Sequence, residues 1–387
     1  MRNDEEVRIL IAGDTVPTDS NSILFTEGDI TSLFGDECVS LFQKVDLSVI
    51  NLETPLVSKL SPIKKFGPTL SAEVNTVQAI KNLGVGLVSL ANNHIKDQGV
   101  QGIEETITVL ENAGIDWIGV GENKKQASQA YFFKKNNLVI GFYSVCENEF
   151  STASKKEPGA NALDICITLS DIYEAKQKCN YLVVLYHGGK EEFRFQTPFE
   201  QNICRKMMDV GADIVLAQHS HCVGTLEQYK NKYILYGQGN FIFDLCNDEN
   251  WKTGLLVELN FNVKTMSLEL IPIVKRDNTV RIADNKTKEK ILSDLKKRSE
   301  VNNSESNVES TYRLSINESL YDSIYPLGGR FTCNRYFRWL DKKTNHKLIK
   351  FIYSEHILLA ILNSIRCETH REDLSTSINI MIENYSK

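Results

Sequence analysis

The sequence predicts an α/β body with a mixed or doubled sheet, followed by a small helical appendage. Short apolar runs typical of buried strands alternate with amphipathic, helix-like segments through the first two thirds of the chain. Two adjacent strand-like runs, residues 254–263 and 266–274, then predict an antiparallel pair. After about residue 282 the sequence becomes charged and rich in Asn and Ser. Alternating elements that lead into a β-rich end are typical of an α/β body.

The elements of the body follow one another in short units. We expect strands over residues 7–12, 45–52, 85–91, 115–120, 138–145, 181–186, 213–217, 232–236 and 240–243. We expect helices over residues 72–82, 100–112, 174–178 and 198–210. The second and fourth of these helices are followed by a glycine that can end a helix. The polar stretches 15–37 and 61–68 are predicted loops, and the first could fold over a site.

The C-terminal part has a different character. The charged run 286–300 and the Asn/Ser/Glu-rich run 301–309 are typical of a linker or a solvated helix. Helices are predicted over residues 330–340 and 346–366, and the second carries an apolar stripe. We therefore expect a body over residues 1–281, and a charged linker with a helical appendage over residues 282–387.

Composition argues against several classes of function. The net charge is −6 and the chain has no basic stripe, so we expect no nucleic-acid partner. It shows no signal-peptide-like segment and no run of about 18 apolar residues, so we expect no membrane segment. The nine cysteines form no C-x-x-C pair, which favours reduced thiols and a cytoplasmic location. The sequence predicts nothing about the oligomeric state.

A carboxylate, amide or imidazole follows each of five predicted strands. These residues are Asp14, Glu53, Asn93 with His94, His187, and the pair His219 and His221. In open α/β sheets ligands bind at the carboxyl ends of the strands, and histidine is the commonest metal ligand. A single His-x-His at a strand end can equally well arise by chance. Five strand ends that each carry a possible metal ligand together predict a metal site. We expect the two histidines to converge because residues i and i+2 of an extended segment point the same way.

Other polar residues have two interpretations each. Lys190, Glu191 and Arg194 come directly after His187, and they either hold an anionic substrate or form a solvated loop. Asn240 lies in a glycine-flanked turn and either lines the site, as a substrate-binding residue, or has a structural role.

Two further residues and the glycine pattern bear on which reactions the chain could catalyse. Asp97 either orients His94, as a partner in catalysis, or caps the helix that follows. Cys222 is interpreted as a small buried residue rather than a ligand or nucleophile. The glycine pairs at 119–121 and 237–239 lack the third glycine of a dinucleotide loop, and no Walker A sequence is present. A dinucleotide-binding or ATPase function is therefore excluded.

The motifs as a set resemble the CapA family, whose members are named for poly-γ-glutamate capsule synthesis. The motifs that carry the resemblance are Gly13-Asp14, Asn51-Leu-Glu53-Thr-Pro55, Ser89 through Gly99, His187-Gly-Gly-Lys-Glu191, Gly211 through His221, and Tyr236 through Asp244. The resemblance covers about residues 7–275 and does not extend to the tail. It implies the calcineurin-like metallophosphoesterase superfamily and a four-layer α/β/β/α sandwich, with helices outside two facing sheets.

The resemblance also implies roles for the residues at the strand ends. Two divalent ions would be bridged by Glu53, with Asp14 and His221 on the first ion and Asn93, His187 and His219 on the second. His94 would lie beside the leaving-group oxygen. Carboxylates with imidazoles and an amide suit Mn, Fe or Zn. The superfamily usually has a histidine where this chain has Val16, and an aspartate where it has Glu53. The first ion would then lack one ligand, so that only one of the two ions is held tightly.

These expectations define a function with two alternatives. The chain is predicted to be a metal-dependent hydrolase, a phosphomonoesterase or phosphodiesterase serving synthesis of a surface polymer such as poly-γ-glutamate. Its substrate would be a small molecule or polymer bearing phosphate or carboxylate groups. One alternative is a non-catalytic, metal-binding accessory subunit of a polyglutamate synthesis or export complex. The other is metal-dependent cleavage of an amide bond.

Overall fold

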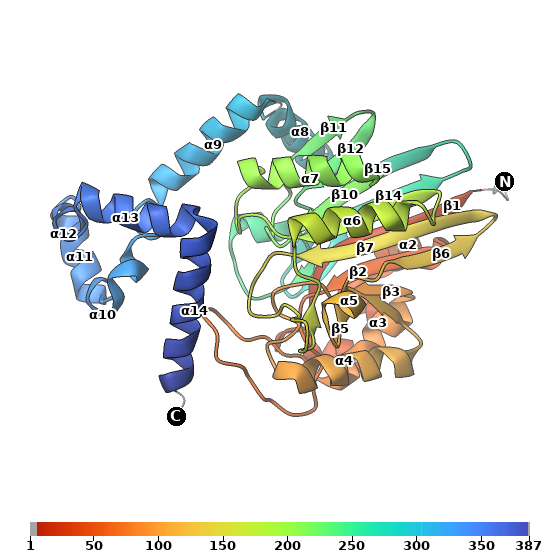
Figure 1. The fold of residues 1–387 in the computed structure, drawn as a ribbon. Coiled ribbons are helices and arrows are strands. Elements are labelled where there is room, and N and C mark those ends of the chain that lie inside the picture. Colours follow the sequence, from red (N-terminus) through yellow and green to blue (C-terminus); the bar gives the residue numbers. More distant parts are fainter. Residues whose placement is uncertain (1–5, 303, 386–387) are drawn as a thin grey trace. The chain divides into compact units, whose positions relative to one another are not determined.

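The computed structural model describes residues 6–302 and 304–385, and the chain divides into two compact units, Met1–Tyr312 and Arg313–Lys387. Figure 1 shows both units. The division falls later in the chain than the boundary at 281/282 that the composition predicts.

The first unit contains a sheet built around β1 (Val7–Val16). On one side of β1 run three parallel strands, β2 (Leu47–Leu52), β3 (Leu87–Ser89) and β4 (Asp116–Ile118). On the other side run three antiparallel strands, β14 (Thr253–Phe261), β15 (Met266–Arg276) and β16 (Thr279–Ile282). A further strand, β13 (Asn240–Phe243), pairs in parallel with the end of β1. The sheet is therefore mixed, and its parallel strands all end at the same edge.

The second sheet has four parallel strands flanked by antiparallel edges. Its order is β11 (Leu226–Tyr229), β12 (Lys232–Tyr236), β10 (Ile214–Gln218), β9 (Tyr181–His187), β7 (Leu138–Cys146) and β6 (Tyr131–Lys135). The outermost strands β11 and β6 are the antiparallel ones. A small separate ladder joins β5 (Val120–Gly121) and β8 (Gly159–Ala160).

The two sheets face each other across an apolar core, because their strands are buried on both faces. Along β1, Ile9 and Ile11 enter the core between the sheets, whereas Leu10 enters the core beneath the helices of the first sheet. Along β9, Val183 enters the core between the sheets, and Val184 packs under the helices of the second sheet. Helices outside two facing sheets make a four-layer α/β/β/α sandwich, so the predicted fold is confirmed.

The outer layers consist of helices that bury one face each. The first sheet is covered by α1 (Ser22–Glu27), α2 (Ile30–Lys44), α3 (Val77–Leu83) and α4 (Gly99–Ala113). The second is covered by α6 (Ile165–Lys176) and α7 (Pro198–Val210), seen in front of it in Figure 1. Shorter helices are α5 (Lys124–Ala127) and the 3-10 turns Val74–Thr76 and Glu249–Lys252. A capping box between Thr197 and Glu200 begins α7.

Two sequence-based expectations need correction. The stretch 15–37 is not a loop, because it contains α1 and the start of α2 with Phe25 and Phe34 buried. Its polar residues are caps: Gly28 ends α1 in the left-handed conformation, and the Asp29 side chain accepts from the backbone of α2. The charged run 286–300 forms α8 (Asn285–Val301), and two of its side chains enter the core between the sheets.

The second unit is helical, as predicted for the appendage. It continues from α9 (Glu305–Glu318) through the 3-10 turn Tyr325–Gly328 to α10 (Gly329–Thr332), α11 (Arg335–Lys343), α12 (Lys347–Ile352), α13 (Glu355–Arg366) and α14 (Glu368–Tyr385). The predicted helix over 346–366 is interrupted before Ser354, whose side chain caps α13. The buried core of this unit is small, with Tyr325, Ile349 and Tyr353 at its centre. Among the described residues, no helix combines the length and the apolar character needed to cross a membrane.

Candidate metal centre

The polar residues predicted to form a site do meet, at the carboxyl ends of strands from both sheets. The first sheet contributes Asp14 near the end of β1, Glu53 just after β2, and Asn93 with His94 in the turn after β3. The second sheet contributes the last residue of β9, His187, and the residues His219 and His221 after β10. All of these side chains are buried.

One half of the centre surrounds Nε2 of His187. This nitrogen lies 3.0 Å from Asn93 Oδ1 and 3.1 Å from His219 Nδ1. It also lies 3.4 Å from Glu53 Oε1. Glu53, His187 and His219 each offer a ligand atom within 4.8 Å of the others, which is compact enough to hold one metal ion. The amide oxygen of Asn93 adds a fourth donor to this group.

The other half consists of Asp14, Glu53 and His221, whose ligand atoms also lie within 4.8 Å of one another. Nδ1 of His221 lies 3.5 Å from Asp14 Oδ2. The second oxygen of Asp14 accepts a hydrogen bond of 2.7 Å from Asn51 Nδ2. Glu53 thus belongs to both halves, as a bridging carboxylate would.

The condition of Glu53 provides a direct test of whether this centre suits a metal. Both carboxylate oxygens are buried and have no hydrogen-bond partner in the described structure. Nε2 of His187 lies 3.4 Å from Oε1. A buried carboxylate that accepts no hydrogen bond is strongly unfavourable, unless a cation or a proton compensates its charge. Donors from both halves surround this carboxylate, so the residues present fit one or two divalent cations.

Mutual interactions shift the pKa values of the centre in opposite directions. Burial raises the pKa of Asp14, but a hydrogen bond with His221 and the charges of His187 and His221 outweigh it and lower the pKa to about 2. Burial lowers the pKa of His221, but the charges of Glu53 and Asp14 outweigh it and raise the pKa to about 9. The negative charges of the carboxylates therefore favour a nearby positive charge, which a protonated imidazole or a divalent cation can provide.

His219 has the opposite behaviour. Burial, followed by the charges of His187 and His221, lowers its pKa well below the usual range. A neutral imidazole has a free lone pair, which is the form that binds metal. His219 is therefore held in the state required of a ligand.

The two histidines of the His-x-His motif converge for a different reason from the one the sequence predicts. Strand β10 ends at Gln218, so the pair is not part of an extended segment. Both residues have positive φ, 88° for His219 and 56° for His221, in the left-handed region. The turn is held by a hydrogen bond of 3.1 Å from the His219 backbone N–H to Asp14 Oδ2. Each such residue costs about 1–3 kcal/mol, a strain that clusters at functional sites.

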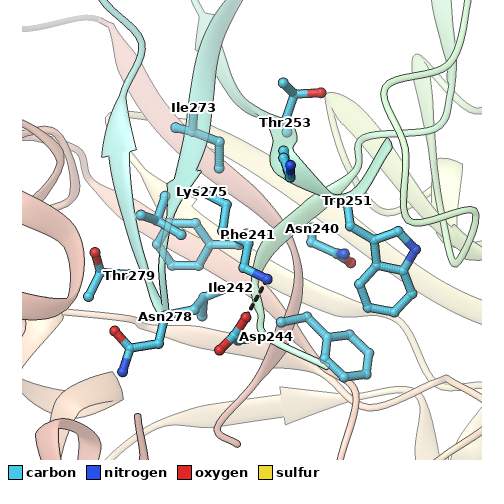
Figure 2. Close-up of a pocket in the computed structure, with 14 residues that line it drawn as sticks. Asn240, Phe241, Ile242, Asp244, Trp251, Thr253, Ile273, Lys275, Asn278 and Thr279 are labelled. Carbon is cyan, nitrogen blue, oxygen red and sulfur yellow. Dashed lines mark ion pairs between the residues drawn. The ribbon is translucent and has the colours of Figure 1, made fainter. Parts of the chain in front are cut away.

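Asn240 lies behind a ligand candidate. Its Oδ1 is 2.9 Å from His221 Nδ1, which leaves the other ring nitrogen of His221 for an ion. The indole of Trp251 packs on the same imidazole, with ring centroids 4.3 Å apart. Figure 2 shows Asn240 beside Trp251, and Asp244 paired with Lys275. Asn240 therefore contacts His221, which gives it a position as a ligand support, and the ion pair of Asp244 is structural.

The His94 ring is oriented by Asp97. Nδ1 of His94 lies 2.6 Å from Asp97 Oδ2. Asp97 does not cap α4, because the cap residue of that helix is Gln98. The orienting interpretation of Asp97 is therefore the one that the contacts favour. Lys65, which the sequence analysis did not single out, also contacts this pair. Its position in a loop of mixed composition gave no periodic signal.

The charged residues after His187 differ in their surroundings. Glu191 Oε1 is 3.9 Å from His219 Nε2, on an exposed side chain. Lys190 packs over the ring of Phe193, 5.2 Å from its centroid. The Nε of Arg194 is buried without a hydrogen-bond partner. Glu191 is thus the candidate that reaches towards a ligand of the centre.

Two further residues complete the surroundings. Burial raises the pKa of Cys222 to about 11, so its thiol stays protonated, in keeping with a small buried residue. Glu149, which the sequence analysis missed, lies near enough to interact with the charges of Lys65 and His94, and burial raises its pKa. It reaches the centre from the loop after β7, which no motif marked.

Comparison with known proteins places the chain in a family. The family model described as "Bacterial capsule synthesis protein PGA_cap" matches residues 8–245, which include every residue of the centre. The chain belongs to this family. The resemblance to CapA proteins seen in the motifs is thereby confirmed.

Proteins similar to this chain carry related names. "Capsule biosynthesis protein CapA" of Bacillus anthracis is 30% identical over 214 residues, which are 53% of this chain and 51% of the relative. "PGA biosynthesis protein CapA" of Bacillus subtilis is 30% identical over 210 residues, 53% of this chain and 55% of the relative. "Probable polyglutamine synthesis accessory protein" of Mycobacterium tuberculosis is 25% identical over 212 residues, 51% of this chain and 56% of the relative.

The chain spans about half the length of these curated relatives. Among solved structures, a hypothetical protein from Thermus thermophilus is similar, with a TM-score of 0.43 and 14% identity. The similarity covers 68% of this chain and 98% of that protein.

Proposed function

We propose that this PGA_cap protein is a metal-dependent hydrolase that cleaves phosphate esters. The observation that supports the proposal is the buried carboxylate of Glu53, which lacks hydrogen-bond partners and lies between two groups of ligand atoms. Divalent ions at that position would supply positive charge to a phosphate and polarise its oxygens. Mn, Fe and Zn all suit a donor set of carboxylates, imidazoles and an amide.

The ligand candidates would be shared between two ions. Glu53 would bridge them. Asp14 and His221 would bind the first ion, with Asn240 holding the ring of His221. Asn93, His187 and His219 would bind the second.

His94 is proposed to donate a proton to the leaving group. Asp97 occupies its Nδ1, so Nε2 is the ring nitrogen that remains for a substrate. The ring lies close enough to His219 for the charge of His94 to lower the pKa of His219. An alcohol leaving group needs a proton, and an imidazole is suited to provide one near neutral pH.

The names of the Bacillus relatives suggest the process, namely synthesis of a capsule or poly-γ-glutamate polymer. We place the proposed hydrolysis in such a pathway, on a small-molecule or polymer substrate that carries phosphate or carboxylate groups. Glu191 and Lys190 at the start of the loop after β9 would then meet the substrate. We propose the cytoplasm as the location.

A second candidate is a non-catalytic, metal-binding accessory protein. The Mycobacterium relative is named as a probable accessory protein of polyglutamine synthesis, which favours this candidate. An accessory protein would keep its metal while hydrolysing none of the esters offered to it. Measured turnover separates the two functions.

The deciding experiment replaces His94 by Asn in the metal-loaded protein. We expect His94→Asn to keep its metal, because His94 belongs to neither ligand group. Turnover of an alkyl phosphate should fall by a factor of about 10²–10⁴, the usual loss for a general acid. Turnover of a nitrophenyl phosphate should fall much less, because that leaving group needs little protonation.

The control is His356→Asn, which changes an exposed histidine of α13 and should alter neither rate. Equal losses on both esters would contradict the role of His94 as a general acid. Absence of turnover in the unaltered protein on either ester would favour the accessory function. Release of glutamate from a γ-glutamyl amide, without ester cleavage, would identify amide hydrolysis.

A further inference from the structure

A buried ammonium group lies beside the proposed proton donor. Lys65 comes from the loop between β2 and α3, and its side chain is 3% exposed. Its Nζ donates to Asp97 Oδ1 at 2.5 Å and lies 3.2 Å from His94 Nδ1. It also donates to the backbone oxygen of Asn93 at 3.4 Å. Lys65 thus touches both members of the His94–Asp97 pair and the residue between them and the centre.

The carboxylate of Asp97 is held on both oxygens. Oδ1 accepts from Lys65, while Oδ2 contacts His94 and accepts from the backbone N–H of Leu70 at 2.6 Å. Leu70 and Lys65 belong to the same loop. The orientation of Asp97, and with it the angle of the His94 ring, therefore depends on this loop.

The loop is fixed to the start of α4 on the other side of Asp97. The backbone N–H of Ile63 donates to the Asp97 carbonyl at 2.9 Å. The side chain of Gln98 accepts from Ser61 N at 2.7 Å and donates to Leu70 O at 3.0 Å. These contacts hold the loop around residues 93–98, so Lys65 has a defined position rather than a flexible one.

Burial of a lysine is a poor way to gain stability. An ion pair taken out of water loses about as much in desolvation as it gains in attraction, and apolar residues of similar size often replace it without loss. The ion pair between Lys176, at the end of α6, and Asp213, just before β10, leaves the side chains 26% and 12% exposed. The almost complete burial of the Lys65 side chain next to His94 thus points to a positional role.

We propose that Lys65 is a positioning residue, which fixes the Asp97 carboxylate and so keeps Nε2 of His94 directed at the substrate. The inference rests on the proposed function, because it assigns His94 to the leaving group. Lys65 itself acts through Asp97 and touches no reacting atom.

The test is the substitution Lys65→Met, which removes the ammonium and keeps the length of the side chain. We expect unchanged metal content and a KM close to that of the unaltered protein. The kcat for an alkyl phosphate should fall about 10–100-fold, comparable to the loss when a partner that orients a metal ligand is removed, and no more than the loss expected for His94→Asn itself. The kcat for a nitrophenyl phosphate should fall much less. Lys65→Gln also removes the charge but keeps a polar end group, and it serves as the second variant if Lys65→Met does not fold. It should likewise lose more activity on the alkyl phosphate than on the nitrophenyl phosphate.

A double-mutant cycle distinguishes positioning from general stability. In the background of His94→Asn, adding Lys65→Met should cause no further loss on the alkyl phosphate, because the group that it orients is gone. Lys176→Met serves as the matched control, since it breaks the ion pair with Asp213 and should leave the ratio of the two ester rates unchanged. Equal losses on both esters, or losses that multiply in the double variant, would overturn the role of Lys65.

A spectroscopic measurement keeps the test independent of activity. In protein with ¹⁵N-labelled histidine, the ring resonances of His94 are identified by their disappearance in His94→Asn. We expect Lys65→Met, but not Lys176→Met, to shift or broaden them. If the unaltered protein cleaves neither ester, the proposed hydrolase function fails, while this comparison still decides on Lys65. Unchanged His94 resonances in Lys65→Met would refute the positioning role.

Discussion

The two halves of the metal centre share Glu53 but differ in what else they offer. The half around His187 adds the imidazoles of His187 and His219 and the amide of Asn93. The half around Asp14 adds one carboxylate and one imidazole. A site with more donors at fixed positions would hold an ion more tightly, so we expect the two halves to differ in metal affinity. The bridging carboxylate alone does not make the halves equivalent.

The half around Asp14 borders an apolar cluster beside His221, rather than a further ligand residue. Val16 packs with Phe243 and Trp251 in a small apolar cluster at the end of β1. Proteins of the wider superfamily that the motifs resemble usually have a histidine at the position of Val16. An apolar side chain there supplies packing against Trp251 and no donor atom, which favours a loosely held first ion.

The largest expected effect comes from removing a ligand of the donor-rich half. His219→Ala should lose most of its bound metal, with affinity reduced by about 100-fold or more, since loss of a mere supporting partner already costs about 10–100-fold. His221→Ala should lose only the weaker ion and keep about half of the metal. Elemental analysis of the purified variants measures both. Similar metal contents in the two variants would make the halves equivalent and end the comparison.

A smaller effect is expected from restoring the missing donor. In the unaltered protein a mild chelator should remove the two ions in separate steps, about tenfold or more apart in chelator concentration. Val16→His should bring the steps closer together by adding a ligand to the weaker half. Val16→Leu controls for the change in size within the apolar cluster. A single step in the unaltered protein would show that the ions leave together and that Val16 has no bearing on affinity.

A separate effect, on folding stability rather than on metal affinity, concerns a carboxyl group behind the donor-rich half. Glu200 is buried beside Gly189, close after His187, and burial raises its pKa from 4.5 to about 8. Between these pH values the folded protein holds a proton that the unfolded chain has released. The contribution of the Glu200 carboxyl to the stability of the folded protein is therefore greatest at or below pH 4.5. It falls by at most about 1.4 kcal/mol per unit as the pH rises towards the pKa of the folded state.

Glu200→Gln isolates that contribution. Glutamine can still accept the hydrogen bond from Thr197 that closes the capping box, but it carries no titrating proton. Denaturant unfolding of the metal-free proteins between about pH 5 and 8 should give a shallower decline for the variant, and a higher stability at the upper end of that range. Parallel pH profiles would show that Glu200 is ionised in the folded state.

The strand ends of the centre could be predicted from sequence because burial leaves a simple signature. A strand buried on both faces is an unbroken apolar run, and the first polar residue after it marks the sheet edge, as Asp14 and His187 do. The turn of His219 and His221 could not be predicted, because its left-handed backbone is fixed by a contact with Asp14 that is distant in sequence. Lys65 was missed for a similar reason, since its partners come from another segment.

The helices α1 and α2 were missed for the opposite reason, a local signal that was ambiguous. Cap residues such as Gly28 and Asp29 are also typical of loops, and they outnumbered the apolar residues in a short window. Phe25 and Phe34 pack edge to face with each other and identify the helices only once the sheet beneath them is known. Tertiary packing, rather than local propensity, decides the structure of such segments.

The origin of the ligand candidates in both sheets has a consequence for the life of the protein in a cell. Asp14, Glu53 and Asn93 come from one sheet, and the three imidazoles come from the other, so an ion between them would work as a clasp across the sandwich. A ligand that binds only the folded chain stabilises it according to its concentration, by about 4 kcal/mol at a thousand times the Kd. Chains without the clasp would open more often and be removed sooner by proteases. The supply of metal would then set how much of this protein a cell retains.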